Sequence, residues 1–226
     1  MIKAVFLDVD NTLLDFDSCG MSAMRRGFEE FGFPFEESMY HETFHRINTP
    51  LWEMIERNEF TREGLFKVRW TLIFRALGIN ADGPAFEKRF LELLETAAVP
   101  VTGATELISY LENKYILCAA SNAFYKQQLK RLTLAGMMPH LQHIFVSEQL
   151  GANKPHPAFF NACLSSLPGI RADECVMIGD SLTADIAGGS NAGMQTIWFN
   201  HDHIAVPANC RANYIVDSLD EIRKIL

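Results

Sequence analysis

Two aspartates separated by one residue, Asp8 and Asp10, could do chemistry together. They follow an apolar segment, Ile2–Leu7, which predicts a buried strand. Two carboxylates this close repel each other when both are ionised, so the pair indicates a bound cation or one protonated acid. Capping of the turn after the strand would explain one aspartate well, but it explains two less well.

Polar groups follow two other parts of the chain in a similar way. Ser121 and Asn122 come after the apolar run Tyr115–Ala120, where the hydroxyl and the backbone N–H groups of the next helix could hold an anion. Taken alone, Ser121 is better explained as a helix N-cap, because serine is common at that position. Lys154 precedes Pro155 in a rigid turn, which sets it apart from an ordinary solvated lysine.

A second pair of carboxylates, Asp180 and Asp185, follows the apolar run Cys175–Ile178. Carboxylate oxygens of this kind suit Mg²⁺, which takes one or two carboxylates and keeps its other positions for water and phosphate. An aspartate at a turn is common, whereas its combination with Asp8 and Asp10 is not. The sequence therefore predicts a metal site that several segments build together.

The elements that must position these residues alternate in type. Stretches with helical spacing separate the later apolar runs, which favours an α/β fold: a doubly wound, Rossmann-like parallel sheet covered on both faces. In such sheets, ligands bind at the carboxyl ends of the strands. The expected strands are Ile2–Leu7, Tyr115–Ala120, His143–Ser147, Cys175–Ile178, Thr196–Phe199 and Tyr214–Val216, and the helices between them include Tyr125–Leu134, Pro157–Ser166 and Thr183–Ala192.

The chain is divided unevenly. Residues 16–97 have an almost wholly helical pattern, so we expect residues 1–15 and 98–226 to form the α/β core and the segment between them to be an inserted helical module. Several aromatic residues of this module could stack on a nucleobase, although helical spacing favours packing in its core. They are Phe44, Trp52, Phe60, Phe66 and Trp70.

Composition narrows the classes of function. The 226 residues are 48% apolar and 21% charged with a net charge of −8, which opposes binding to nucleic acid. A phosphorylated partner is therefore expected to be a small molecule. No apolar run could span a membrane and no export signal is visible, so we expect a cytoplasmic protein. The five cysteines include no Cys-x-x-Cys pair, which indicates buried free thiols.

In this order, the segments around Asp8, Ser121, Lys154 and Asp180 resemble the four motifs of the haloacid dehalogenase superfamily. The resemblance covers the whole core. It implies that Asp8 is a nucleophile and Asp10 the general acid and base. It also implies that Ser121, with the neighbouring Asn122, and Lys154 bind the phosphoryl group.

The same resemblance implies a Mg²⁺ cofactor. Its ligands would be Asp8, the backbone carbonyl of Asp10, and Asp180, with Asp185 in support. Asn11 stands where many members of the superfamily carry glycine.

Two further similarities concern the substrate. The helical segment resembles a C1-type cap, and Leu14–Asp17 with Gly179–Ile186 resembles the YjjG-type 5′-nucleotidase branch. They imply hydrolysis of pyrimidine nucleoside monophosphates by a monomer or homodimer. A phosphatase or phosphomutase acting on sugar phosphates shares all four motifs and stays open. A 2-haloacid dehalogenase has no need of Asp10, and a binding module has little reason to keep the full set of polar residues.

A competing motif lies in the helical segment. His41-Glu42-Thr43-Phe44-His45 matches the His-Glu-x-x-His pattern that places two imidazoles on one helical face for Zn²⁺ in metalloproteases. That function would need a third ligand and a substrate cleft. We expect His41 and His45 to be surface residues of the helical segment, and His201 and His203 to lie in a solvated loop.

Overall fold

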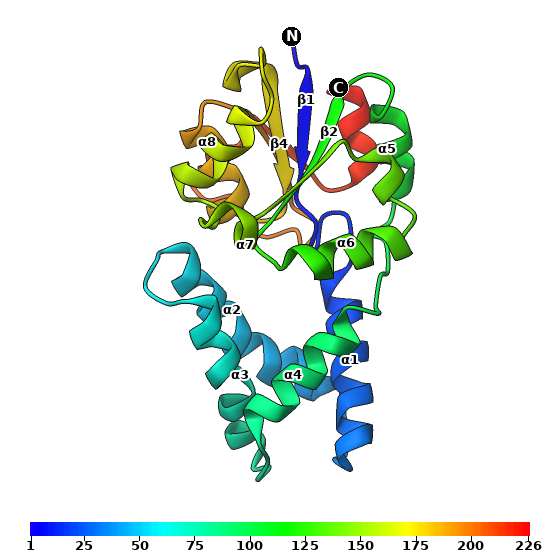
Figure 1. Ribbon diagram of the computed structural model, residues 1–226, viewed down its shortest axis with the longest axis vertical. Coiled ribbons are helices and arrows are strands. Elements are labelled where there is room, and N and C mark those ends of the chain that lie inside the picture. The colour runs from blue at the N-terminus through cyan, green and yellow to red at the C-terminus, as the bar shows by residue number, and fades with distance from the viewer. The chain divides into compact units, whose positions relative to one another are not determined.

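The computed structural model describes residues 1–226 and divides into two compact units. Met1–Phe16 and Ala98–Leu226 form one unit, here called the sheet unit, and Asp17–Ala97 form the helical unit. The sequence places the first boundary one residue earlier. Figure 1 shows the chain leaving the sheet unit after its first strand and returning to it for the remaining strands.

The sheet unit contains a six-stranded sheet with the order β3-β2-β1-β4-β5-β6, and every neighbouring pair is parallel. The order reverses direction between β1 and β4, which confirms the doubly wound α/β fold. All six strands lie where the apolar runs predict them. Their bounds are β1 Ala4–Leu7, β2 Ile116–Ser121, β3 His143–Val146, β4 Cys175–Gly179, β5 Gln195–Phe199 and β6 Tyr214–Val216.

Alternate residues of the strands enter two apolar clusters, one on each face of the sheet. Val5 and Leu7 pack in the cluster that includes residues of α5 (Ala104–Leu111), α6 (Tyr125–Leu134) and η5 (Leu219–Lys224). Ala4 and Phe6 enter the cluster on the other face. Because side chains on a strand alternate between faces, this pattern gives three layers with helices on both sides of the sheet.

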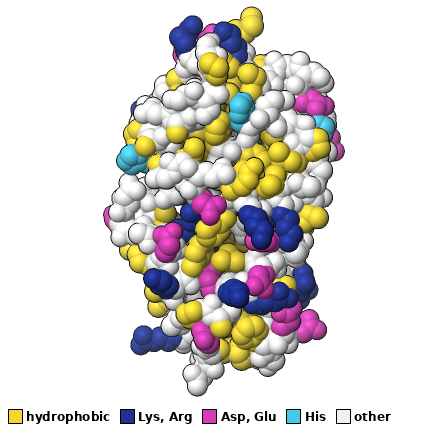
Figure 2. Space-filling model, viewed as in Figure 1, with side chains coloured by type: hydrophobic (Ala, Val, Ile, Leu, Met, Phe, Trp, Pro, Cys, Tyr) yellow, Lys and Arg dark blue, Asp and Glu magenta, His cyan; other side chains and the backbone are white.

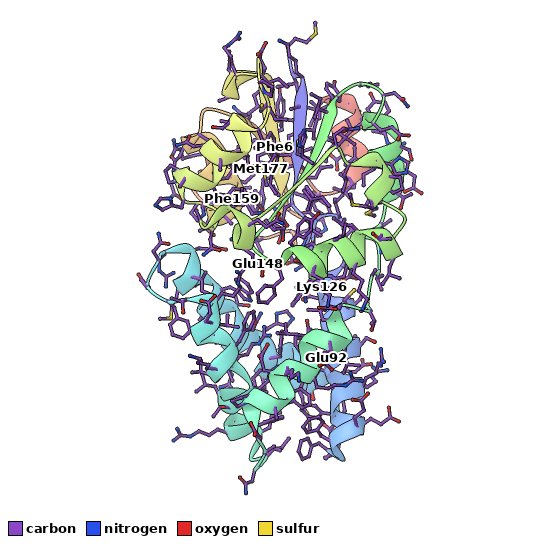
Figure 3. All side chains as sticks on the ribbon, in the orientation of Figure 1. Phe6, Glu92, Lys126, Glu148, Phe159 and Met177 are labelled. Atoms are coloured by element: carbon purple, nitrogen blue, oxygen red, sulfur yellow. The ribbon has the colours of Figure 1, made fainter.

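Helix α8 (Pro157–Ser165) covers the second face. Figure 3 shows Phe6 on β1 and Met177 on β4 close to Phe159 on α8, and all three are fully buried. The short helix α9 (Gly188–Asn191) packs closely against this layer. The space beside Gly188 is too small for a side chain, since a Cβ atom there would collide with the ring of Phe160. The remaining connections contain α7 (Ser147–Leu150), η2 (Met138–His140), η3 (Ala172–Glu174) and the π-helical turn η4 (Leu182–Ala187).

The cysteines agree with the expectation of free thiols. None forms a disulfide, and four are buried, whereas Cys210 is only partly buried. Cys163 and Cys175 lie in the second apolar cluster, where burial raises the pKa of Cys163 to about 12 and that of Cys175 to about 11. These thiols are therefore protonated and unreactive at neutral pH.

The helical unit is built around an aromatic core. Trp70 packs with its ring centroid 4.3 Å from that of Phe86 and 5.1 Å from that of Phe90, and Phe44 is also fully buried. Phe44 and Trp70 therefore pack in the core of the helical unit, as their helical spacing predicts. The helices are α1 Phe16–Phe31, the π-helical η1 Met39–Phe44, α2 His45–Glu56, α3 Arg62–Leu77 and α4 Gly83–Leu94.

An ion pair is buried among these rings. Arg69 donates two hydrogen bonds to the carboxylate of Glu87, at 3.0 and 2.5 Å, and a third to the Asn48 side chain at 2.8 Å. The guanidinium also lies 5.1 Å from the centroid of the Phe90 ring. Burial raises the pKa of Glu87, and Arg69 opposes that shift.

Charges on the surface are mixed in sign. On the face shown in Figure 2, cationic and anionic side chains of the helical unit are interspersed rather than gathered by sign. Arg89, for example, pairs with Glu30 at 2.6 Å and with Glu92 at 2.9 Å. No helix of the chain combines the length and the apolar character that crossing a membrane would require.

Candidate active site

The predicted site residues lie at the carboxyl edge of the sheet. Asp8 follows β1, and its backbone N–H continues the ladder by donating to the carbonyl of Ile178 at 2.9 Å. Ser121 ends β2, and Asp180 follows β4. The strand order reverses between β1 and β4. Open parallel sheets bind ligands beyond the carboxyl ends of the strands at such a reversal.

Lys154 lies at the centre of this edge and is not a solvated lysine. Its side chain is 2% exposed, and Nζ donates to Asp8 Oδ1 at 2.5 Å, to Asp185 Oδ1 at 2.7 Å and to the carbonyl of Ala120 at 2.7 Å. An ammonium group has three donors, so every one of them is satisfied. Burial alone would lower the pKa of Lys154, but Asp185 and Asp8 raise it, so the group is cationic.

The backbone of Lys154 is held by Asn122. The Asn122 side chain accepts from the Lys154 N–H at 2.7 Å and donates to the Lys154 carbonyl at 2.9 Å, and the bond between Lys154 and Pro155 is a cis peptide. The amide of Asn122 therefore binds the loop that carries Lys154. The phosphate contact that the sequence predicts for Asn122 stays a prediction.

Asp180 joins the two carboxylates that contact Lys154 in a cluster of three. Oxygens of Asp8, Asp180 and Asp185 lie within 4.8 Å of one another. Burial raises the pKa of Asp8 to about 7 although Lys154 opposes it, and burial, followed by the charges of Asp8 and Asp185, raises the pKa of Asp180. One lysine cannot neutralise three acids, so a divalent cation fits the donor set in charge and in ligand type.

Asp180 and Asp185 are fixed by neighbours that the sequence analysis did not assign. The hydroxyl of Thr12 donates to Asp180 Oδ1 at 3.2 Å, and Trp198 Nε1 donates to the Asp180 carbonyl at 2.8 Å. Asp185 Oδ2 accepts from the Ser181 N–H at 3.1 Å, so Lys154 and Ser181 bind different oxygens of this carboxylate. Thr12 could have been noticed, since it belongs to the same short segment as the first two aspartates.

The side chain of Asp10 lies apart from the carboxylate cluster and contacts α6 instead. Arg131 Nη1 donates to Asp10 Oδ1 at 2.5 Å, and Gln128 Nε2 donates to Asp10 Oδ2 at 2.6 Å. Sequence reasoning did not single out either partner. The available signal was weak: two polar residues one helical turn apart on a segment predicted to be helical.

The competing zinc motif gathers no third ligand. The rings of His41 and His45 are stacked with centroids 6.3 Å apart, and His45 Nε2 lies 3.4 Å from Asp17 Oδ1. The only group of three potential metal-binding side chains in the chain is that of Asp8, Asp180 and Asp185. The geometry therefore does not support a zinc protease. His201 and His203 lie in a turn and loop after β5, as expected.

The chain is similar to known proteins in both sequence and structure. The family model of haloacid dehalogenase-like hydrolases matches residues 2–193. The putative HAD-hydrolase YfnB of Bacillus subtilis is 34% identical to this chain, and the alignment covers 99% of this chain and 95% of the YfnB chain. Its crystal structure, bound to magnesium, superposes with a TM-score of 0.94 and covers 100% of this chain and 98% of that chain.

Two other relatives are named for a substrate. The pyrimidine 5′-nucleotidase PynA of Streptococcus pneumoniae is 33% identical to this chain, and the alignment covers 97% of this chain and 93% of the PynA chain. The pyrimidine 5′-nucleotidase YjjG of Escherichia coli is 26% identical to this chain, and the alignment covers 98% of this chain and 96% of the YjjG chain.

Proposed function

Because the chain belongs to the haloacid dehalogenase-like hydrolases, we propose that it is a Mg²⁺-dependent phosphomonoester hydrolase that forms an aspartyl-phosphate on Asp8. The observation that supports this most strongly is the buried contact of Asp8 with Lys154 inside a cluster of three carboxylates. A purely structural site would balance its charges, whereas this one has an excess of negative charge that a bound cation would balance, so that an anionic phosphoryl group could approach Asp8.

The residues have distinct tasks in this proposal. An Asp8 oxygen attacks phosphorus, Ser121 binds a phosphoryl oxygen, and the positive charge of Lys154 beside Asp8 lowers the repulsion between the two anions. Asp8, Asp180 and the backbone carbonyl of Asp10 would hold Mg²⁺, with Asp185 in support. When bound, the ion would supply positive charge that stabilises the transferring phosphoryl group.

Asp10 completes the reaction with one proton transfer in each of the two steps. As the ester bond breaks, the Asp10 carboxyl gives its proton to the leaving oxygen and becomes a carboxylate. It then takes a proton from the water that attacks the aspartyl-phosphate, and inorganic phosphate and free Asp8 result. A dehalogenase needs no such residue, so Asp10 favours phosphate chemistry.

For the substrate, we propose a nucleoside 5′-monophosphate, with pyrimidines preferred. The similarity to PynA and YjjG over nearly the whole chain supports this choice. A sugar phosphate or another small phosphometabolite is the second candidate, because the same four motifs serve both.

A hydrolysis screen tests both levels of the proposal. Nucleoside monophosphates, sugar phosphates and an aryl phosphate are each incubated with the enzyme in Mg²⁺ and in chelator, and released phosphate is measured. We expect release only with the metal, and fastest from pyrimidine nucleoside monophosphates. Turnover in chelator would contradict the mechanism, whereas a preference for sugar phosphates would contradict only the substrate.

A further inference from the structure

The carboxylate of Asp10 is held at both oxygens by two buried side chains of α6. Arg131 Nη1 donates to Oδ1 at 2.5 Å and Gln128 Nε2 donates to Oδ2 at 2.6 Å. Arg131 Nη1 lies a further 3.2 Å from Gln128 Oε1, which closes a ring of hydrogen bonds. Arg131 is 1% exposed and Gln128 0%, whereas the Asp10 side chain is 31% exposed. The two partners are therefore buried, whereas the acid is partly exposed.

Gln128 also contacts Ser121. Its Nε2 donates to Ser121 Oγ at 2.9 Å, and the backbone N–H of Ala123 donates to the same oxygen at 3.2 Å. A hydroxyl group accepts two hydrogen bonds and donates one. Because both acceptor positions are taken, the Ser121 proton is left for another acceptor, as binding of a phosphoryl oxygen would require.

We propose that Gln128 and Arg131, together called the α6 clamp, are positioning residues for the reaction. They hold the Asp10 carboxyl group in one orientation toward the leaving oxygen, and Gln128 directs the Ser121 hydroxyl toward the phosphoryl group. The inference rests on the proposed phosphatase function. Its physical basis is that both residues lie one turn apart on one rigid helix, so a single element sets the direction of the acid and of the phosphate donor.

In the transfer to Asp8, orientation of the acid matters only where the leaving group needs its proton, whereas the later role of Asp10 as a base toward water is common to all substrates. In transfer to Asp8, the phosphorus–oxygen bond breaks and its electron pair goes to the leaving oxygen. A nucleoside 5′-oxygen must be protonated by Asp10 as this happens, whereas p-nitrophenolate is stable as an anion. Loss of the α6 clamp should therefore affect the two leaving groups differently.

The test compares kcat/KM for uridine 5′-monophosphate and p-nitrophenyl phosphate at saturating Mg²⁺. For Gln128→Met and Arg131→Met we expect kcat/KM to fall about 10- to 100-fold more for the nucleotide than for the aryl ester, a part of the usual contribution of a general acid. Arg131→Lys keeps a cationic donor and should restore part of the loss. Gln127→Met is the matched control, since Gln127 is a buried glutamine next to the clamp.

The ratio of the two kcat/KM values decides the outcome. A ratio that changes in the clamp variants and stays at the wild-type value in Gln127→Met supports the inference. Equal losses on both substrates, or no loss, would overturn the inference about the α6 clamp. The proposed phosphatase function would stand in that case, because the wild-type enzyme would still turn over the substrates. Absence of wild-type turnover on any phosphomonoester would overturn both. If Arg131→Met does not fold, Gln128→Met decides alone, because it exchanges one neutral side chain for another.

Discussion

Arg69 of the helical unit and Lys154 of the sheet unit are both buried cations, and their surroundings differ in charge balance. In the helical unit, Arg69 faces one carboxylate, that of Glu87, and the amide of Asn48 completes its hydrogen bonds. In the sheet unit, Lys154 donates to Asp8 and Asp185, and Asp180 lies in the same cluster. The first group is neutral as a pair, and the second carries an excess of negative charge.

This difference distinguishes a structural ion pair from a site that does chemistry. A buried pair with matched charges and satisfied hydrogen bonds needs nothing further, and breaking it costs stability. A cluster with more acids than cations is unfavourable by itself, so it is explained by a ligand that supplies positive charge. Substitutions in the two clusters should therefore affect different measured quantities.

The largest effect is expected for Asp8→Asn. The substitution removes the proposed nucleophile, so kcat should fall by about 1000-fold or more. It also removes one negative charge from an over-charged cluster, so the melting temperature in chelator should stay the same or rise. Phosphate release and calorimetry measure the two quantities. Appreciable remaining activity would reject Asp8 as the nucleophile.

The next effect tests the neutral pair. Arg69→Met leaves Glu87 buried without its cation and should lower the free energy of unfolding by about 3–5 kcal/mol. Adding Glu87→Gln should recover part of this loss, and kcat of the folded protein should not change. Urea unfolding measures the loss, with Arg89→Met as a control because the Arg89–Glu30 pair is much more exposed. A loss of kcat without a loss of stability would remove the distinction between the two clusters.

Metal binding should stabilise the sheet unit by a smaller amount. A ligand at 100 times its Kd adds about 2.7 kcal/mol to the free energy of unfolding, so Mg²⁺ should raise the melting temperature relative to chelator. Asp180→Asn should reduce this rise, and Asp173→Asn, an exposed acid outside the cluster, should leave it unchanged. Equal rises in both variants would argue against the carboxylate cluster as the site.

The smallest effect is expected for Glu174, whose ion-pair partner Lys3 has a half-exposed side chain. Lys3 and then the backbone N–H of Arg171 lower the pKa of Glu174 to about 2 from its ordinary value of 4.5. The folded state thus favours the charged form, so its stabilisation is present above pH 4.5 and is lost as the pH falls toward 2.

Glu174→Gln should therefore destabilise the protein slightly at pH 7, and the difference from wild type should shrink on acidification. Urea unfolding at pH 7, 4 and 3 follows this trend. A difference that is independent of pH would show that the charge of Glu174 contributes nothing.

Much of the architecture could be predicted because its signals are local. Each strand is a short apolar run, and helix α6 begins and ends at Tyr125 and Leu134 as its periodicity indicates. The π-helical turns were not foreseen, because hydrophobic spacing does not separate them from α-helix. For the site, the residue types and their place after strands indicated carboxylate and phosphate chemistry.

The sequence by itself determined which residues could do chemistry and that parallel strands would bring them to one edge. Only the tertiary structure decided their partners. Asp10 contacts Gln128 and Arg131 across 118 and 121 positions of the chain, and Lys154 reaches Asp8 across 146. Such contacts depend on how each crossover helix packs against the sheet, and no short pattern records that packing. The folded protein is therefore what distinguishes the balanced pair of Arg69 from the over-charged cluster around Lys154.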